Sequence, residues 1–214
     1  VDDYTKVQIT KADPDGEPVV GAKLEIRNAD DEQVASWTTG EEPHSITKLP
    51  AGTYTLKETA APDGYLKAED LEFTVTESGE VLEVKMVDNY IKVQIAKVDP
   101  DGEPVIGATM ELWDASGEKV DAWTTEETPY SITKLAAGVY TLKETAAPGG
   151  YLTAKDLEIT VKESSELQEF EMVDDYTKVQ ITKADPDGEP VVGAKLEILD
   201  ADGEQVAAWE TTEE

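Results

Sequence analysis

One unit of 86 residues repeats along the chain without gaps, and this period limits the possible fold more than any other feature. VDDYTKVQITKADPDGEPVVGA begins at Val1, VDNYIKVQIAKVDPDGEPVIGA begins at Val87, and the first version returns at Val173. A period of this length is typical of a small independent domain rather than of one unit in a solenoid. We therefore expect a first module at residues 1–88, a second at 89–174, and the N-terminal half of a third at 175–214.

Short segments with alternating apolar and polar residues fill each unit. The first unit contains VQIT, AKLEI, YTLKET, LEFTV and LEVKM, and this period of two residues is typical of half-buried strands. The segments Asp-Pro-Asp-Gly from Asp13 and Pro-Asp-Gly from Pro62 are predicted turns, because proline presets φ and glycine accepts positive φ. No segment has helical periodicity over ten residues. The sequence predicts an all-β chain of tandem immunoglobulin-like or transthyretin-like sandwiches.

The charge balance excludes two classes of partner. The chain has 48 acidic and 18 basic residues, which gives a net charge of −30. Binding to nucleic acid or to an anionic membrane surface needs a basic patch, so neither is expected, and mutual repulsion favours a monomer. The absence of cysteine excludes disulfides and thiolate metal sites. No apolar run is long enough to insert across a bilayer, and we expect no metal or cofactor.

Strand parity places three ionisable side chains of each full module on core-facing positions. Each of them follows apolar residues two and four positions earlier along the chain, so it shares their face of the strand. These residues are Lys11, Glu58 and Asp88 in the first module, and Lys97, Glu144 and Asp174 in the second.

Two interpretations of these inward-facing residues are open from the sequence alone. They could form a buried salt bridge, or lie at strand ends where they reach water. They could also react. Burial disfavours the ammonium form of the lysine and keeps one carboxyl protonated, so that it can donate a hydrogen bond and move protons. Held close together in a dry core, the amine could then attack the aspartate carbonyl and expel water, which forms an isopeptide bond.

Three motifs carry a resemblance to a known family, namely VQITKADPDGEPVVGA, YTLKETAAPDGY and KMVDNY. They resemble the B-type (CnaB-like) domain of Gram-positive collagen adhesins and pilins, and are similar to the streptococcal fibronectin-binding domain that was split into a reactive tag and catcher. The resemblance covers both full modules and the half module. It implies a bond between the first-strand lysine and an Asn or Asp of the last strand, assisted by the glutamate of the ETAAP strand.

Carried over residue by residue, the resemblance implies Lys11–Asp88 and Lys97–Asp174 cross-links, assisted by Glu58 and Glu144 in turn. Asn89 is the alternative partner in the first module, because many relatives use asparagine, but strand parity favours Asp88. The half module has the equivalent lysine, Lys183, without the two carboxyls. We expect Lys183 to remain an unmodified amine within its own chain.

The resemblance also implies a function. The chain would be a stalk or spacer segment of a secreted, cell-wall-anchored adhesin or pilin, and no enzyme beyond its own single-turnover cross-linking. Its partners would be the neighbouring modules of the same array. Contact with host extracellular matrix would come through another part of the parent protein.

Three other functions are possible for a chain with these residues. An enzyme is disfavoured because the only histidine, His44, is replaced by Tyr130 in the second module, so we expect a surface loop residue there. Glu58 and Asp88 could be a glycosidase pair, but that leaves the inward lysine unexplained. A calcium site at Asp13-Pro-Asp-Gly-Glu lacks the further spaced ligands of a calcium loop, so a turn is expected.

The third alternative is an adhesin module that recognises a host matrix protein or a glycan. Trp37 and Trp123 occupy equivalent places and could form a binding platform, although a packed sheet edge explains them as well. Near-identical copies favour a spacer, because a specific binding head is usually unique. Trp113 is not repeated, and we expect it to be exposed.

Overall fold

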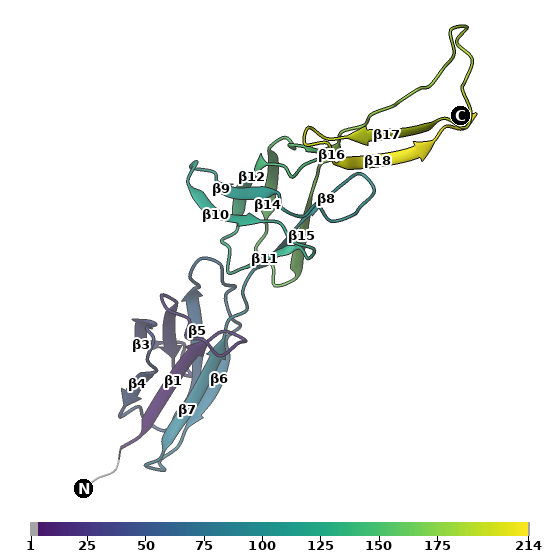
Figure 1. Ribbon diagram of the computed structural model, residues 1–214. Coiled ribbons are helices and arrows are strands. Elements are labelled where there is room, and N and C mark those ends of the chain that lie inside the picture. The colour runs from purple at the N-terminus through teal and green to yellow at the C-terminus, as the bar shows by residue number, and fades with distance from the viewer. Residues whose placement is uncertain (1–3, 214) are drawn as a thin grey trace. The chain divides into compact units, whose positions relative to one another are not determined.

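The alternating segments of module one form two facing sheets in the computed structural model, which describes residues 4–213 of the chain (Figure 1). One sheet has the strand order β4-β1-β7 and the other has the order β3-β2-β5-β6. The strands are β1 (Lys6–Ala12), β2 (Lys23–Arg27), β3 (Gln33–Thr38), β4 (His44–Thr47), β5 (Gly52–Ala60), β6 (Leu71–Val75) and β7 (Val81–Val87).

Module two repeats this arrangement. Its sheets have the orders β11-β8-β15 and β10-β9-β12-β14, and a short pair, β13-β16, lies outside them. The strands are β8 (Lys92–Val98), β9 (Thr109–Asp114), β10 (Lys119–Thr124), β11 (Tyr130–Thr133), β12 (Gly138–Ala146), β13 (Tyr151–Leu152), β14 (Leu157–Val161), β15 (Leu167–Val173) and β16 (Asp175–Tyr176).

The first and last main strands of each sandwich are parallel neighbours. β1 pairs with β7 over its whole length, from Lys6 opposite Val81 to Ala12 opposite Val87. β8 and β15 pair in the same way. The last residue of β7 therefore lies beside the last residue of β1, and the residue after β7 is held close to the end of the first strand.

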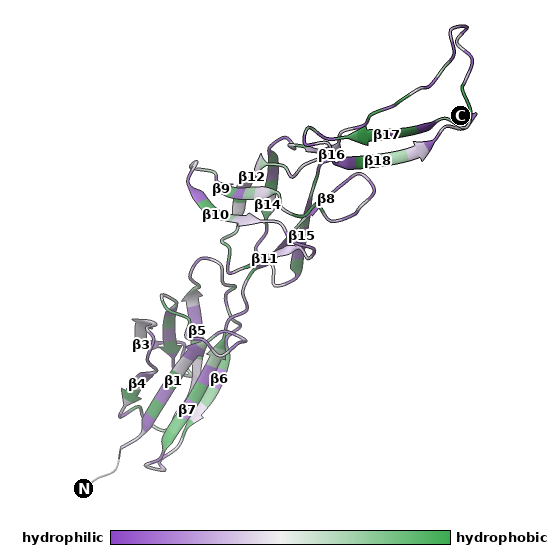
Figure 2. Cartoon of the chain, in the orientation of Figure 1, coloured by the Kyte–Doolittle hydropathy of each residue, from purple (hydrophilic) through white to green (hydrophobic). Residues whose placement is uncertain are grey.

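Each sandwich has its own apolar core between its two sheets. The core of module one takes Ile9 from β1, Leu24 from β2, Leu56 from β5 and Val84 from β7. Figure 2 shows the pattern that produces it, with apolar and polar residues alternating as bands along β6 and β7. The predicted all-β sandwich is confirmed, and no helix that could span a membrane occurs among residues 4–213.

Residues Thr177–Glu214 form a separate unit. As far as residue 213, its regular structure is a hairpin of β17 (Lys195–Leu199) and β18 (Gln205–Glu210). The segment 178–184, which is equivalent to β1, is not a strand. β1 is stabilised by pairing with β4 and β7, and residues 177–213 include no strands equivalent to these two.

All five segments predicted as strands in module one are strands, but two strands were not predicted. These are β3 and β4, which pair with β2 and β1 at the edges of the two sheets. The expectation of a loop at His44 was wrong, because His44 begins β4 and is half-buried. Its ring stacks on Trp37 with a centroid distance of 4.3 Å.

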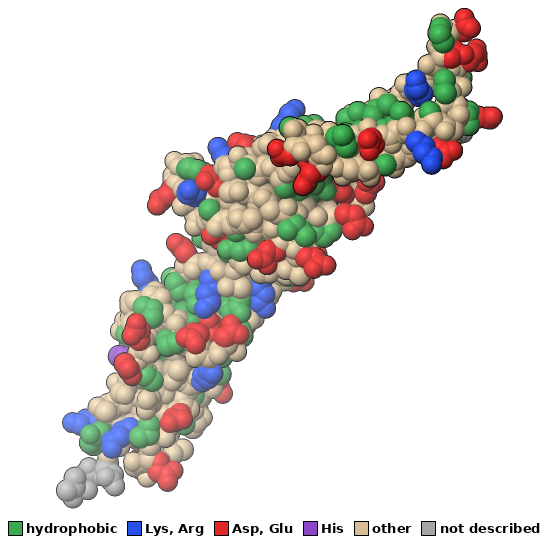
Figure 3. Space-filling model, in the orientation of Figure 1, with side chains coloured by type: hydrophobic (Ala, Val, Ile, Leu, Met, Phe, Trp, Pro, Cys, Tyr) green, Lys and Arg blue, Asp and Glu red, His purple; other side chains and the backbone are tan. Residues whose placement is uncertain are grey.

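Charged side chains cover the outer faces of the strands. On the face shown in Figure 3, acidic side chains are distributed over both sandwiches and interspersed with fewer lysines and arginines. Their positions agree with the polar half of the alternating pattern, which points away from the cores. The strong negative charge is therefore a property of the solvated surface.

Candidate functional site: a buried lysine between two carboxyls

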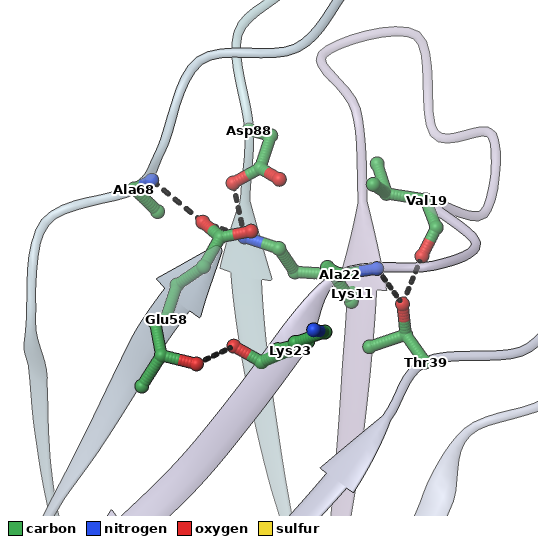
Figure 4. A network of polar contacts seen from close by, with 9 residues as sticks. Lys11, Val19, Ala22, Lys23, Thr39, Glu58, Ala68 and Asp88 are labelled. Carbon is green, nitrogen blue, oxygen red and sulfur yellow. Dashed lines mark hydrogen bonds and ion pairs between the residues drawn. The ribbon is translucent and has the colours of Figure 1, made fainter. Parts of the chain in front are cut away.

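Three separate strands bring the predicted residues of module one together. Lys11 lies on β1, Glu58 lies on β5 of the facing sheet, and Asp88 directly follows β7. Because all three side chains point inward, they meet between the two sheets, as Figure 4 shows. The side chain of Lys11 is 1% exposed, and those of Glu58 and Asp88 are 0% exposed.

The lysine contacts both carboxyls. Lys11 Nζ donates a hydrogen bond to Glu58 Oε2 at 3.0 Å and another to Asp88 Oδ1. The same Oε2 atom accepts a hydrogen bond of 2.7 Å from the backbone N–H of Ala68. The backbone of Asp88 is held beside the end of β1. β1 and β7 pair as far as Ala12 opposite Val87, and Asp88 N then donates to Ala12 O at 3.0 Å. Backbone hydrogen bonds thus hold the strand end that carries Asp88 and the carboxyl group of Glu58 in place.

Burial changes the pKa of one of these carboxyls. It raises the pKa of Asp88 to about 7, against the lowering effect of Lys11, and the neighbouring Glu58 adds to the increase. Two oxygens, Glu58 Oε1 and Asp88 Oδ2, are buried and accept no hydrogen bond among the described residues. One proton shared by the two carboxyls would satisfy both oxygens and would also make the whole set electrically neutral.

Module two has the same arrangement with small differences. Lys97 Nζ lies 3.6 Å from Glu144 Oε2 and hydrogen-bonds to Asp174 Oδ1. Ala154 N donates to Glu144 Oε2 at 2.6 Å. Burial is the main cause that raises the pKa of Glu144, and Asp174 adds to it. Glu144 Oε1 and Asp174 Oδ2 repeat the two buried oxygens of module one that accept no hydrogen bond in the described structure.

The two remaining lysine-site predictions concern Asn89 and Lys183. The side chain of Asn89 is exposed, and its backbone carbonyl accepts a hydrogen bond of 2.8 Å from Leu66 N. Strand parity turns it away from Lys11. Lys183 is also exposed. The structure brings Lys11, Glu58 and Asp88 together and leaves Asn89 outside the group.

The backbone amides of Ala68 and Ala154 were not identified from the sequence. Each fixes the glutamate of its module from a loop that runs alongside β5 or β12. Every residue except proline carries an N–H group, so no residue type marks this role in a sequence. Only the path of the loop after the Pro-Asp-Gly or Pro-Gly-Gly turn places the donor.

The tryptophans support the packed-edge interpretation. Trp37 packs against the core of module one and Trp123 against that of module two. Trp123 stacks on Tyr130 at 4.4 Å beside an open groove of about 540 Å³, whereas the equivalent groove in module one is about 40 Å³. A binding platform shared by the repeats would need similar grooves. Trp113 is half-buried rather than exposed, and its indole N–H donates to Glu111.

The Asp13 segment is the predicted turn. Gly16 N donates to Asp13 O at 3.1 Å, and Gly16 has a φ of +91°, which suits glycine. No cluster of side chains with the composition of a metal site occurs in the part of the chain that the structure describes. Asp13 instead contacts a lysine of module two, which sequence reasoning did not identify.

Comparison with known proteins identifies the family of the two sandwiches. A family described as the SpaA prealbumin-like fold domain matches residues 5–90 and 91–176. The trypsin-resistant surface T6 protein of Streptococcus pyogenes serotype M6 is 38% identical over 79 residues, which is 36% of this chain and 14% of that protein.

One similar solved structure is that of the Bacillus anthracis TIE protein, which is 27% identical to this chain with a TM-score of 0.48. The match covers 99% of this chain and 42% of that chain. The shaft pilin SpaA from Lactobacillus rhamnosus GG has 14% identity, with 84% of this chain and 99% of that chain covered, and a TM-score of 0.44. The chain thus spans only part of the first two relatives. Since the family match covers both complete sandwiches, the chain belongs to the SpaA prealbumin-like fold domain family.

Proposed function

We propose that each full module closes an intramolecular isopeptide bond, between Lys11 and Asp88 in module one and between Lys97 and Asp174 in module two. The observation that carries this proposal is a fully buried lysine in contact with two buried carboxyls that share no other cation. A plain salt bridge would keep an ammonium and a carboxylate in the core, which is costly. The reaction replaces both with an uncharged amide.

The reaction needs no cofactor. With Asp88 protonated, the ammonium of Lys11 transfers a proton to Glu58, and the lone pair of the neutral Nζ attacks Asp88 Cγ. Glu58 accepts a proton from the attacking nitrogen and passes one to the departing Asp88 oxygen. The C–O bond breaks, one water leaves, and an N–C amide bond remains. Burial and fixed geometry replace chemical activation, since the groups are held within contact distance.

The cross-link suits a CnaB-type spacer of a Gram-positive surface protein. Tension that enters at β1 passes through Lys11 to Asp88 and on to β8, so residues 12–87 carry none of it. The relatives named as a surface protein and a shaft pilin support placement of the modules in a pilin or wall-anchored adhesin outside the cell. The neighbouring modules are then the direct partners, and a host matrix ligand would bind elsewhere in the parent protein.

Intact-mass spectrometry of the purified chain tests the proposal. We expect a mass lower than the sequence mass by two waters, one for each full module. Loss of ammonia in place of one water would identify Asn89 as the partner in module one. A mass equal to that of the sequence would exclude the cross-link, and the buried set would then be a salt bridge.

A further inference from the structure

A third buried carboxyl of module one also has a lysine partner, and this lysine comes from module two. Asp13 lies on the turn after β1, and its side chain is 0% exposed. Its Oδ1 accepts hydrogen bonds from Asp15 N at 3.0 Å and Glu17 N at 2.9 Å. Those bonds orient the other oxygen, Oδ2, which lies 2.7 Å from Lys134 Nζ.

Two tyrosines of module one and its connecting segment enclose the same ammonium group. Lys134 Nζ lies 5.4 Å from the ring centroids of both Tyr65 and Tyr90. The rings meet edge to face at 6.4 Å and 90°, and the Tyr90 hydroxyl donates to Asp15 Oδ2 at 2.6 Å. A carboxylate with two aromatic faces is a binding site for a cation.

The backbone around the lysine is equally specific. Lys134 has a φ of +62°, which is uncommon for a residue with a side chain, and its N–H donates to Ile91 O at 2.9 Å. Ile91 N in turn donates to Gly64 O at 2.9 Å. A Cβ on Gly64 would lie 2.1 Å from Lys134 O, so only glycine allows the two modules to approach this closely.

An apolar contact crosses the same junction. Leu66 of module one packs against the core of module two, next to the polar contacts of Lys134. Its N–H also donates to Asn89 O in the connecting segment. The junction thus combines an ion pair to a buried carboxylate, backbone hydrogen bonds and hydrophobic packing, which is more than a flexible linker provides.

We propose that Asp13, Tyr65 and Tyr90 form a lysine-binding site at the end of module one, through which Lys134 holds module two in a single orientation. This inference goes beyond the cross-link and does not require it. Its partner is a following module of the same kind, recognised by a lysine in the loop before the fifth strand.

Both halves of this interface are repeated in the sequence. In module two, Tyr176 donates to Asp101 Oδ2 at 3.0 Å, and the rings of Tyr151 and Tyr176 meet edge to face at 6.5 Å. At the other end of module one, Lys48 has the φ of Lys134, at +64°. A head-to-tail interface with both halves on each unit can continue along an array of any length.

Spin-label distances across the junction test this inference. The chain has no cysteine, so Glu83→Cys and Glu169→Cys, both on exposed strand positions, place one label on each module. Double electron–electron resonance then gives the distribution of distances between the modules. We expect one narrow peak for the otherwise unchanged chain, and loss of that peak in Lys134→Met and in Gly64→Ala.

Matched controls come from the repeat. Lys48→Met removes the equivalent lysine at the other end of module one, and Gly150→Ala adds a Cβ at a φ of +93° that meets no heavy atom within 4 Å. Both should keep the narrow peak. A broad distribution in the unchanged chain, or a narrow peak in Lys134→Met, would overturn the inference. The intact mass of each variant shows independently whether the two cross-links have formed.

Discussion

At the scale of single residues, the unusual feature of this chain is where it places charge. Acidic residues on a solvated surface are ordinary, and most of the 48 in this chain are there, but two carboxyls and a lysine inside an apolar core are not. The core cluster of module one is otherwise made of Val, Ile, Leu, Met and aromatic side chains. Such a group persists either as a well-paired ionic set or as the precursor of a bond that removes its charge.

Glu58→Gln separates these two roles. Glutamine keeps the volume and an acceptor for the Ala68 N–H, but it cannot take up and return a proton. We expect module one to fold without its cross-link, so that the intact mass is lower by one water only. Module two serves as the internal control, and Glu144→Gln should give the mirror result. Loss of both waters in either variant would show that the glutamate is not the proton carrier.

The pKa of Asp88 predicts how the reaction depends on pH. Its carboxyl is protonated below about pH 7 because burial raises its pKa, and it loses that proton as the pH rises through this value. Expulsion of water needs the proton, so the rate of bond formation in module one should decrease above about pH 7. Chains recovered unfolded from inclusion bodies can be refolded at several pH values and quenched in denaturant after different times. Intact-mass spectrometry then gives the fraction that has lost a water. A rate that increases across this range would contradict the assignment.

At the scale of strands, the parallel pair β1–β7 determines what a cross-link can do. The bond would join the end of β1 to the residue after β7, and would therefore close a loop over most of the module. A closed loop has fewer unfolded conformations, which raises the free energy of unfolding.

We expect Lys11→Met and Asp88→Ala each to lower the stability of module one by about 4 to 5 kcal/mol, the chain-entropy value for a loop of this length. The two variants remove opposite ends of the same bond, so agreement between them separates the cross-link from local packing effects. Differential scanning calorimetry should show one transition shifted and the transition of module two unchanged. If both variants unfold at the same temperatures as the unchanged chain, the cross-link does not stabilise module one.

Strand parity was enough to predict which residues of the site point into the core, and the family resemblance predicted how they pair. Side chains alternate strictly along a strand, so apolar neighbours at Val7 and Ile9 fix the direction of Lys11. The same reasoning failed for β3 and β4, which are edge strands with half-buried patterns and carry few apolar residues. Their position is determined by pairing with β2 and β1, which a single sequence does not display.

At the scale of the whole chain, the repeat was predicted in full, but the contact between modules was not. Asp13 and Lys134 are far apart in the sequence and belong to different copies. In the sequence, Asp13 is explained by a turn and Lys134 by a solvated loop. The signal that could have identified them is the recurrence of the same turn, tyrosines and ITKL segment in successive modules, and it gains meaning only when one module is placed against the next.

Force spectroscopy on the full chain tests the load path through successive modules. If both cross-links form, tension applied at the two ends bypasses residues 12–87 and 98–173, and neither sandwich lengthens when pulled. Lys11→Met opens module one to the load and releases 76 residues, so one step of about 250 to 270 Å should be gained at the maximum extension per residue. Lys97→Met should give a step of the same size from module two, and the double variant should give two. Steps of this length in the unchanged chain would show that tension passes through the sandwiches and that no covalent bond shields them.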